Sequence, residues 1–285
     1  MNFRSACVFV DGENLRHSII DLFQSDFNPA DYLPKSADWE DFFNDLVKKG
    51  DAELRLRTYW YVVDEIDFWP YGLSRLLKSD DIGTMETILR KYRTYASQLD
   101  LISDATSRQE KVRSLIRLLV SRERSIKARF DGWQVFQNGI AHRFDSIEFR
   151  RAGSIQYDLF AQRFNEEKGV DVKLATDLLK LNEIYDVGVV VSGDGDYVPA
   201  VQTVKDWGKH IVNVSFLKKN GGVLPGGARR LNRCTDRVIE LQYDEVRNFM
   251  KIIPKIRAAS PSIAAPAAIR PVASGPGDSG VGPVS

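Results

Sequence analysis

Several features are rare or missing in this chain, and each absence excludes a class of protein. Only 2 cysteines and 3 histidines occur in 285 residues, which excludes a disulfide framework and a cluster of zinc ligands. No run of about 18 apolar residues occurs, and residues 1–4 show no signal-peptide layout, so we expect a cytoplasmic protein without a membrane partner. No glycine-rich fingerprint follows the first predicted strand, which excludes a Rossmann dinucleotide site.

The net charge of +1 hides an uneven distribution. Residues 111–129 contain seven bases and one acid, and residues 205–237 contain eight bases and two acids. One such stretch is as typical of a solvated helix face as of a binding surface. Two of them in one chain favour a polyanionic partner.

The most informative stretch is residues 187–199, where an apolar run ends at a loop with two carboxylates. Val189, Val190 and Val191 are β-branched and consecutive, a pattern typical of a central parallel strand buried on both faces. Asp194 and Asp196 follow directly. In open α/β sheets ligands bind beyond the carboxyl ends of the strands, so these acids are expected to hold a cation or to move protons.

Residues 6–10 predict a first buried strand, which places Asp11 at the same kind of strand end. Gly12 lets the chain turn tightly into a helix that carries Leu15, Ile19 and Leu22 at helical spacing. Asn14 has two open interpretations at this stage. Its side chain either caps the helix or points towards whatever Asp11 holds.

A further helix is predicted to begin near Lys168, with Asp171 at the head of an apolar stripe formed by Leu174 and Leu178. Asp171 is therefore either a first-turn acid favoured by the helix dipole or a ligand aimed into the crevice. Asp177 lies six residues further on, about 240° around the helix, so it cannot share the face of Asp171.

The remaining pattern predicts an α/β fold in which helices flank a parallel sheet and a helical insertion follows the second strand. The insertion covers residues 71–130, has two or three helices, and turns these side chains inward: Leu115, Ile116, Leu118, Leu119 and Ile126. Further strands are expected at residues 53–63, 133–137, 146–151, 210–216 and 237–241. Further helices are expected at residues 38–49, 154–167, 197–207 and from 242 to about 252. We expect one domain over residues 1–253 and a disordered tail rich in Pro, Ala and Gly over 254–285.

Four acids thus share one rim of the predicted sheet: Asp11, Asp171, Asp194 and Asp196. Crowded carboxylates repel one another by several kcal/mol unless a cation neutralises them. Oxygen ligands without histidine favour Mg²⁺ or Mn²⁺ over zinc. Hard cations held by carboxylates are the arrangement used for phosphodiester hydrolysis.

Three segments together resemble the NYN domain family, in particular its LabA-like bacterial branch within the PIN-like nucleases. They are Phe9-Val10-Asp11-Gly12-Glu13-Asn14-Leu15, Lys168-Gly169-Val170-Asp171-Val172 and Val191-Ser192-Gly193-Asp194-Gly195-Asp196-Tyr197. The resemblance spans residues 6 to about 216 and is specific in order and spacing. It implies a PIN-like, Rossmann-like parallel sheet and metal-dependent cleavage of RNA with Mg²⁺ or Mn²⁺.

Carried over by position, the resemblance makes Asp11, Asp171, Asp194 and Asp196 the catalytic and metal-binding acids. The resemblance also implies that the Asn14 side chain orients the site and does not cap the helix. The candidate substrate-binding or supporting residues are Asn14, Ser192, Asp177, Lys168, Lys111, Arg113, Arg117, Arg229 and Arg230. The insertion and the extended C-terminus depart from the family pattern, and we expect the basic face of the insertion to follow the phosphate backbone.

The sequence is also compatible with two other functions. The first is a non-catalytic RNA-binding or regulatory module that keeps the fold, against which the presence of all four acids argues. The second is a phosphatase with Asp11 as covalent nucleophile, which would need an aspartate where Glu13 stands. RNA, single-stranded or structured, is the expected partner, and the oligomeric state, with a homodimer as one alternative, stays open.

Overall fold

The computed structural model describes residues 3–24, 26–28, 31–225 and 228–253. The chain divides into Met1–Ile253 and Pro254–Ser285. The predicted disordered tail falls on 254–285 and lies outside the described residues.

The strands of the first unit form one mixed sheet in the order β4-β3-β2-β1-β5-β6-β7, with β8 also pairing with β6. The strands are β1 (Ser5–Asp11), β2 (Leu54–Trp69), β3 (Ile147–Asp158), β4 (Arg163–Lys168), β5 (Val187–Val191), β6 (His210–Leu217), β7 (Val223–Leu224) and β8 (Arg237–Leu241). Pairing is parallel except for the β3–β4 and β6–β7 pairs. The predicted α/β class with a mostly parallel sheet is confirmed and is consistent with a PIN-like domain.

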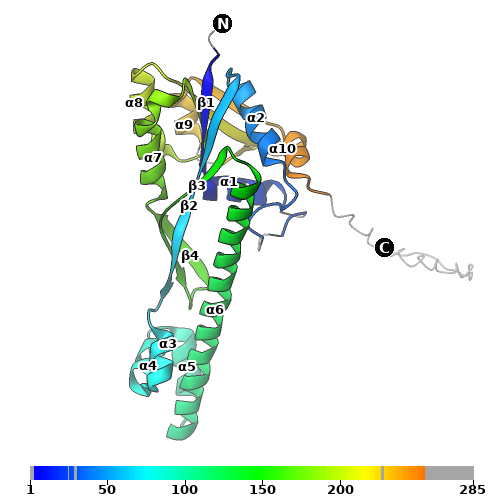
Figure 1. The fold of residues 1–285 in the computed structure, drawn as a ribbon. Helices are drawn as coiled ribbons and strands as arrows, with labels where there is room; N and C mark the ends of the chain where they lie inside the picture. Colours follow the sequence, from blue (N-terminus) through cyan, green and yellow to red (C-terminus); the bar gives the residue numbers. More distant parts are fainter. Residues whose placement is uncertain (1–2, 25, 29–30, 226–227, 254–285) are drawn as a thin grey trace, which may run out of the picture. The chain divides into compact units, whose positions relative to one another are not determined.

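Helices cover both faces of the sheet (Figure 1). They are α1 (Gly12–Leu22), α2 (Trp39–Lys49), α3 (Leu73–Ser79), α4 (Ile82–Arg90), α5 (Arg93–Asp100), α6 (Ala105–Arg143), α7 (Val170–Lys180), α8 (Val198–Asp206), α9 (Arg229–Cys234) and α10 (Tyr243–Met250), with short 3₁₀ turns at Asn182–Ile184 and Gly195–Tyr197. Val8 and Val10 pack in the core with α1, α2 and α10, whereas Cys7 and Phe9 pack with α7 and α8. This alternation along β1 shows why the strand has to be apolar on both faces.

The insertion follows β2 as predicted, but it has four helices over the described residues, and its last helix extends to Arg143. The four helices α3, α4, α5 and α6 share a separate apolar core. Tyr157 of β3 and Leu159 and Phe160, which follow β3, also belong to this core. Leu118 was expected in this core, but its side chain is 52% exposed.

Two predicted elements are wrong. Residues 133–137 are not a strand but part of α6, where Phe130, Trp133 and Gln137 follow one another at helical spacing and face the sheet side. Residues 154–167 are not a helix but the strands β3 and β4 with their connection. The spacing of Leu159, Phe160 and Phe164 imitates a helical stripe, yet Leu159 and Phe160 belong to the turn between two half-buried strands.

Gly153 fixes the geometry of this hairpin. Its φ of +65° is strained for other residues, and a Cβ there would lie 1.7 Å from the Lys168 carbonyl oxygen. The backbones of β3 and β4 therefore meet closely at the residue before α7, which positions the start of that helix and hence Asp171.

Other elements agree with their predictions. The strands at 6–10, 53–63, 210–216 and 237–241 and the helices at 38–49 and 197–207 are present, with bounds that differ by a few residues. The second strand is longer and runs to Trp69, and the last helix ends at Met250. No helix among the described residues is both long and apolar enough to span a membrane. Both cysteines are free, as expected.

Candidate active site

The site lies where the chain order of the sheet reverses. β1 pairs with β2 on one side and with β5 on the other, and Val10 is in register with Val191. Asp11, the last residue of β1, and Ser192, the residue after β5, are therefore neighbours at the carboxyl edge. The Ser192 hydroxyl donates to Asp11 Oδ2 at 2.9 Å. Such a switch point is where open α/β sheets bind ligands.

Asp11 is held by a set of donors although its side chain is removed from water. The residue is 1% exposed. Asn14 donates its backbone N–H to Oδ1 at 3.1 Å and its side-chain amide to Oδ2 at 2.6 Å. Asp11 is thus the cap of α1, while Asn14 supports it. Asn14 Oδ1 also accepts the backbone N–H of Gly193 at 3.3 Å, so this side chain ties the first strand end to the second.

Tyr197 connects Asp11 to Asp171, which lies in the second of the three segments. Its hydroxyl lies 2.7 Å from Asp171 Oδ1 and 3.2 Å from Asp11 Oδ2, and the side chain is fully buried. Burial and the neighbouring Asp11 and Asp171 carboxylates raise the pKa of Tyr197, which keeps the phenol protonated. A phenol has one proton to donate, so it cannot satisfy both carboxylates fully.

Hydrogen bonds within the loop after β5 fix its backbone conformation. Asp194 donates its backbone N–H to Ser192 Oγ at 3.0 Å, and its own Oδ1 accepts the N–H of Asp196 at 2.9 Å. A Cβ on Gly193 would lie 2.3 Å from the Pro225 ring, so only glycine fits there. The Arg230 side chain runs past Gly195, where its Cβ and Cδ lie 3.5 Å from the position of an added Cβ.

The electrostatics of the site favour protons or cations. Burial, reinforced by Asp171, raises the pKa of Asp11 to about 6 even though Asn14 and Ser192 donate to it. Burial, together with Asp11, Glu13 and Asp171, raises the pKa of Glu167 to about 8. Among the described residues no hydrogen-bond partner reaches Glu167 Oε2. The carboxylates therefore carry unrelieved repulsion.

A cavity of about 660 Å³ opens above these groups. Its polar lining includes Glu13, Asn14, Glu167, Asp171, Asp194 and Asp196. Its other lining is aromatic and includes Tyr32, Phe130, Trp133 and Phe164. The guanidinium of Arg16 lies 4.5 Å from the Trp133 ring centre within this lining. A lining that contains both acids and aromatic rings suits a ligand with both phosphate and base.

The donor set fits a hard divalent cation by its chemistry, since all of the acidic donors are oxygens. The side chains do not, however, form a ready cage. Over the described ranges, no three or more carboxylate, imidazole or thiolate groups lie in a metal-holding arrangement. Asp171, Asp194 and Asp196 line the cavity, whereas Asp11 lies behind it, bonded to Ser192 and Tyr197.

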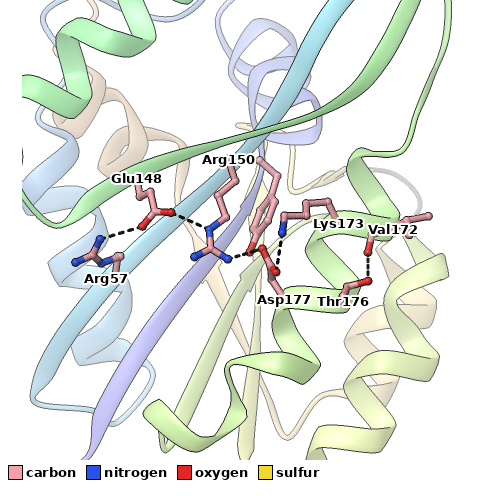
Figure 2. A network of polar contacts seen from close by, with 8 residues as sticks. Arg57, Glu148, Arg150, Val172, Lys173, Thr176 and Asp177 are labelled. Carbon is pink, nitrogen blue, oxygen red and sulfur yellow. Dashed lines mark hydrogen bonds and ion pairs between the residues drawn. The ribbon is translucent and has the colours of Figure 1, made fainter.

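Asp177 is separate from this cluster, as its helical position predicts. It is 1% exposed and accepts from Tyr61 at 3.2 Å and from Lys173 at 3.0 Å. It also pairs with Arg150 of β3, which in turn bonds Glu148 (Figure 2). Burial opposes ionisation of Asp177, but the bonds from Arg150 and Lys173 lower its pKa overall. Its contacts join α7 to the sheet.

The candidate basic residues divide into near and remote groups. Arg230 lies beside the acidic loop, and Arg229 is exposed on the same short helix α9. Lys168 lies at the end of β4 and lines a neighbouring cavity. Lys111, Arg113 and Arg117 lie on the part of α6 that packs with the insertion, and none lines the acidic cavity. Arg113 is engaged there by Asp80 through bonds of 2.7 and 2.8 Å.

Two site residues were missed by the sequence analysis. Glu167 was placed in a helix that does not exist, so its position beside Asp171 could not be recognised. Tyr197 follows Asp196 in the third segment, but nothing in a sequence indicates that its hydroxyl turns back to Asp11. Only the assembled fold brings these two side chains to the acids.

The fold and the site together define an α/β domain with an acidic site at the carboxyl ends of its central strands. Residues 105–242 match the NYN domain model. The matched part of the chain contains Asp171, Asp194 and Asp196 and begins after Asp11. This part of the chain is therefore similar to NYN domains, as the second and third of the three segments indicated, and NYN domains belong to the PIN-like nuclease superfamily.

A curated relative is the low amplitude and bright protein LabA of Synechococcus elongatus. It is 32% identical over 104 residues, which are 36% of this chain and 50% of that protein. The match thus spans only half the length of the relative. A solved structure, that of a protein of unknown function from Vibrio parahaemolyticus, covers 84% of this chain and 93% of its own at 14% identity and a TM-score of 0.37.

Proposed function

We propose that this protein is a metal-dependent ribonuclease that cleaves RNA phosphodiester bonds at the cavity above Asp11. One observation supports it most strongly. Asp11 and Asp171, which are far apart in the sequence, share the hydroxyl of Tyr197 beneath a cavity that Asp171, Asp194 and Asp196 line. Asp11 is buried and Asp171 and Asp194 are half-buried, yet no described residue forms an ion pair with any of them, which favours a cation as the missing component.

Asp11, Asp171, Asp194 and Asp196 would hold Mg²⁺ or Mn²⁺. When bound, such ions polarise a phosphate and lower the pKa of a coordinated water. Asn14 and Ser192 keep Asp11 oriented through their hydrogen bonds, while Tyr197 links Asp11 to Asp171. Arg230 lies where its guanidinium can bind a phosphate of the substrate next to the acidic loop. The role of the basic insertion in holding RNA stays a prediction, as does the cytoplasmic location.

The test is incubation of the purified protein with labelled single-stranded RNA, structured RNA and DNA in Mg²⁺, Mn²⁺ or EDTA, beside Asp194→Asn. We expect cleavage of RNA that needs the metal and that falls at least about 100-fold in the variant, because the site loses one of its ligands. Cleavage that persists in both EDTA and Asp194→Asn would overturn the proposal.

A non-catalytic RNA-binding or regulatory module is the second candidate. The observation that favours it is the lack of a ready metal cage among the described residues. In the same experiment this candidate predicts RNA binding without cleavage in either metal.

A further inference from the structure

A second cavity of about 660 Å³ adjoins the acidic one along the hairpin of β3 and β4. Its lining consists of Asp67, Tyr71, Ser154, Gln156, Arg163, Phe164, Asn165 and Lys168. Phe164 and Asn165 line both cavities, so the two spaces meet at the strand β4. Alternate residues of the hairpin line different cavities. Ile155 and Glu167 line the first cavity, and Gln156 and Lys168 line the second.

The two cavities differ in charge. The first is lined by five acids with Arg16, which pairs with Glu13, and His17, and the second by one acid, Asp67, with two bases, Arg163 and Lys168. Both bases are exposed, and no described residue forms an ion pair with either of them, unlike Arg113, which Asp80 engages. Unpaired bases next to an acidic centre suit the phosphates that flank a scissile bond.

The second cavity also contains a held aromatic ring. Tyr71 is 57% exposed, and its hydroxyl accepts the Gln156 side-chain amide at 2.9 Å. Its ring stands edge-on to Trp69, with centroids 5.5 Å apart at 84°. Trp69 in turn donates its indole N–H to the hydroxyl of Tyr92 at 2.9 Å. Tyr92 belongs to the insertion, so the insertion helps to fix this ring.

The amides beside the ring are ordered as well. Asn165 donates to Gln156 Oε1 at 2.9 Å, which continues the line of hydrogen bonds from Tyr71 to the strand shared by both cavities. Amide groups in a fixed orientation can bond the edges of a base that stacks on a neighbouring ring. The surface therefore offers two bases for phosphate, one ring for stacking and two amides for base edges.

We propose that this second cavity is a subsite for a nucleotide flanking the scissile phosphate, so that the substrate is a single strand that bends around β4. The inference rests on the proposed function, since it takes the acidic cavity as the cleavage site. A duplex does not fit this role, because its bases are stacked on one another and cannot lie on Tyr71.

The test is fluorescence anisotropy with a labelled 12-nucleotide oligouridine in EDTA, which measures binding without cleavage. Arg163→Gln/Lys168→Gln should weaken binding at least about tenfold and should lower the slope of log affinity against log salt by roughly 1.4, for two phosphate contacts. Tyr71→Ala, which leaves the charge unchanged, should weaken binding about tenfold through lost stacking.

The matched control is Arg75→Gln/Lys78→Gln, two exposed bases on α3 that line neither cavity. It removes the same charge and should leave binding within about twofold. Equal losses in the control and in the double variant, or an unchanged affinity in the double variant and in Tyr71→Ala, would overturn the subsite. The subsite would also be overturned if duplex RNA bound the wild type as tightly as the single strand does and lost as much affinity in the double variant and in Tyr71→Ala. Thermal unfolding of each variant shows whether the fold is kept.

These outcomes separate the subsite from the proposed function. If no RNA is cleaved in Mg²⁺ or Mn²⁺ while the variants still lose single-strand binding selectively, the nuclease proposal fails, and the cavity stands as a single-strand binding site of a non-catalytic module.

Discussion

Asp11→Asn should lower the rate of RNA cleavage by about 100-fold or more, since a metal site is expected to supply several kcal/mol of transition-state stabilisation. Asp11 accepts four hydrogen bonds through Asn14, Ser192 and Tyr197, so its position is fixed by both strand ends and by the chain after β5. Asparagine keeps the shape of the side chain but removes its charge. The measurement is the single-turnover rate on labelled single-stranded RNA at saturating Mn²⁺.

The control for this prediction is Asp64→Asn. Asp64 is an exposed acid of β2 that does not line the acidic cavity, and its replacement should leave the rate within about twofold. A rate for Asp11→Asn that equals the rate of this control would contradict a metal-binding role for Asp11.

The stability of the metal-free protein should fall as the pH rises from about 5 to 8. The pKa of Asp11 is raised from 3.8 to about 6 in the fold, so between these values the folded state binds more protons than the unfolded state. By linkage, stability then decreases with pH, and Asp11 alone accounts for roughly 3 kcal/mol once it is ionised. Glu167, with a pKa raised from 4.5 to about 8, extends the decrease to higher pH.

Denaturant unfolding in EDTA at pH 5, 6, 7 and 8 measures this decrease, and Asp11→Asn should flatten its lower part. Asp177 does not interfere, because its lowered pKa makes its contribution disappear only in more acidic solution. A free energy of unfolding that stays constant or rises between pH 5 and 8, or an equal decrease in Asp11→Asn, would contradict the buried, crowded state of these acids.

The parts of the site that follow buried strands could be predicted from the sequence. Residues 187–191 are apolar throughout because β5 is covered on both faces, so the strand and the acids after it are visible in the sequence. The same applies to β1 and Asp11. Helical geometry was also sufficient to separate Asp177 from Asp171, since a turn of 100° per residue fixes which side chains share a face.

The parts that depend on contacts between distant segments could not be predicted. Arg150, the partner of Asp177, lies in the strand predicted at residues 146–151, which is the first part of β3, but its pairing follows from the position of α7 beside β3. The strand β3 is mostly half-buried, so it shows no clean alternation, and the apolar residues after it imitate a helical stripe. Because the hairpin of β3 and β4 was taken for a helix, Glu167 and the cavity around Arg163 had no place in the predicted site.

The central claim is that the acids around Asp11 bind a divalent cation, and calorimetric titration of the metal-free protein with Mn²⁺ at pH 7.5 tests it most directly. We expect saturable binding by the wild type, with proton release from Glu167, whose raised pKa of about 8 leaves it largely protonated at this pH, and at least about tenfold weaker binding by Asp194→Asn. No binding by the wild type, or equal binding by the variant, would contradict the claim.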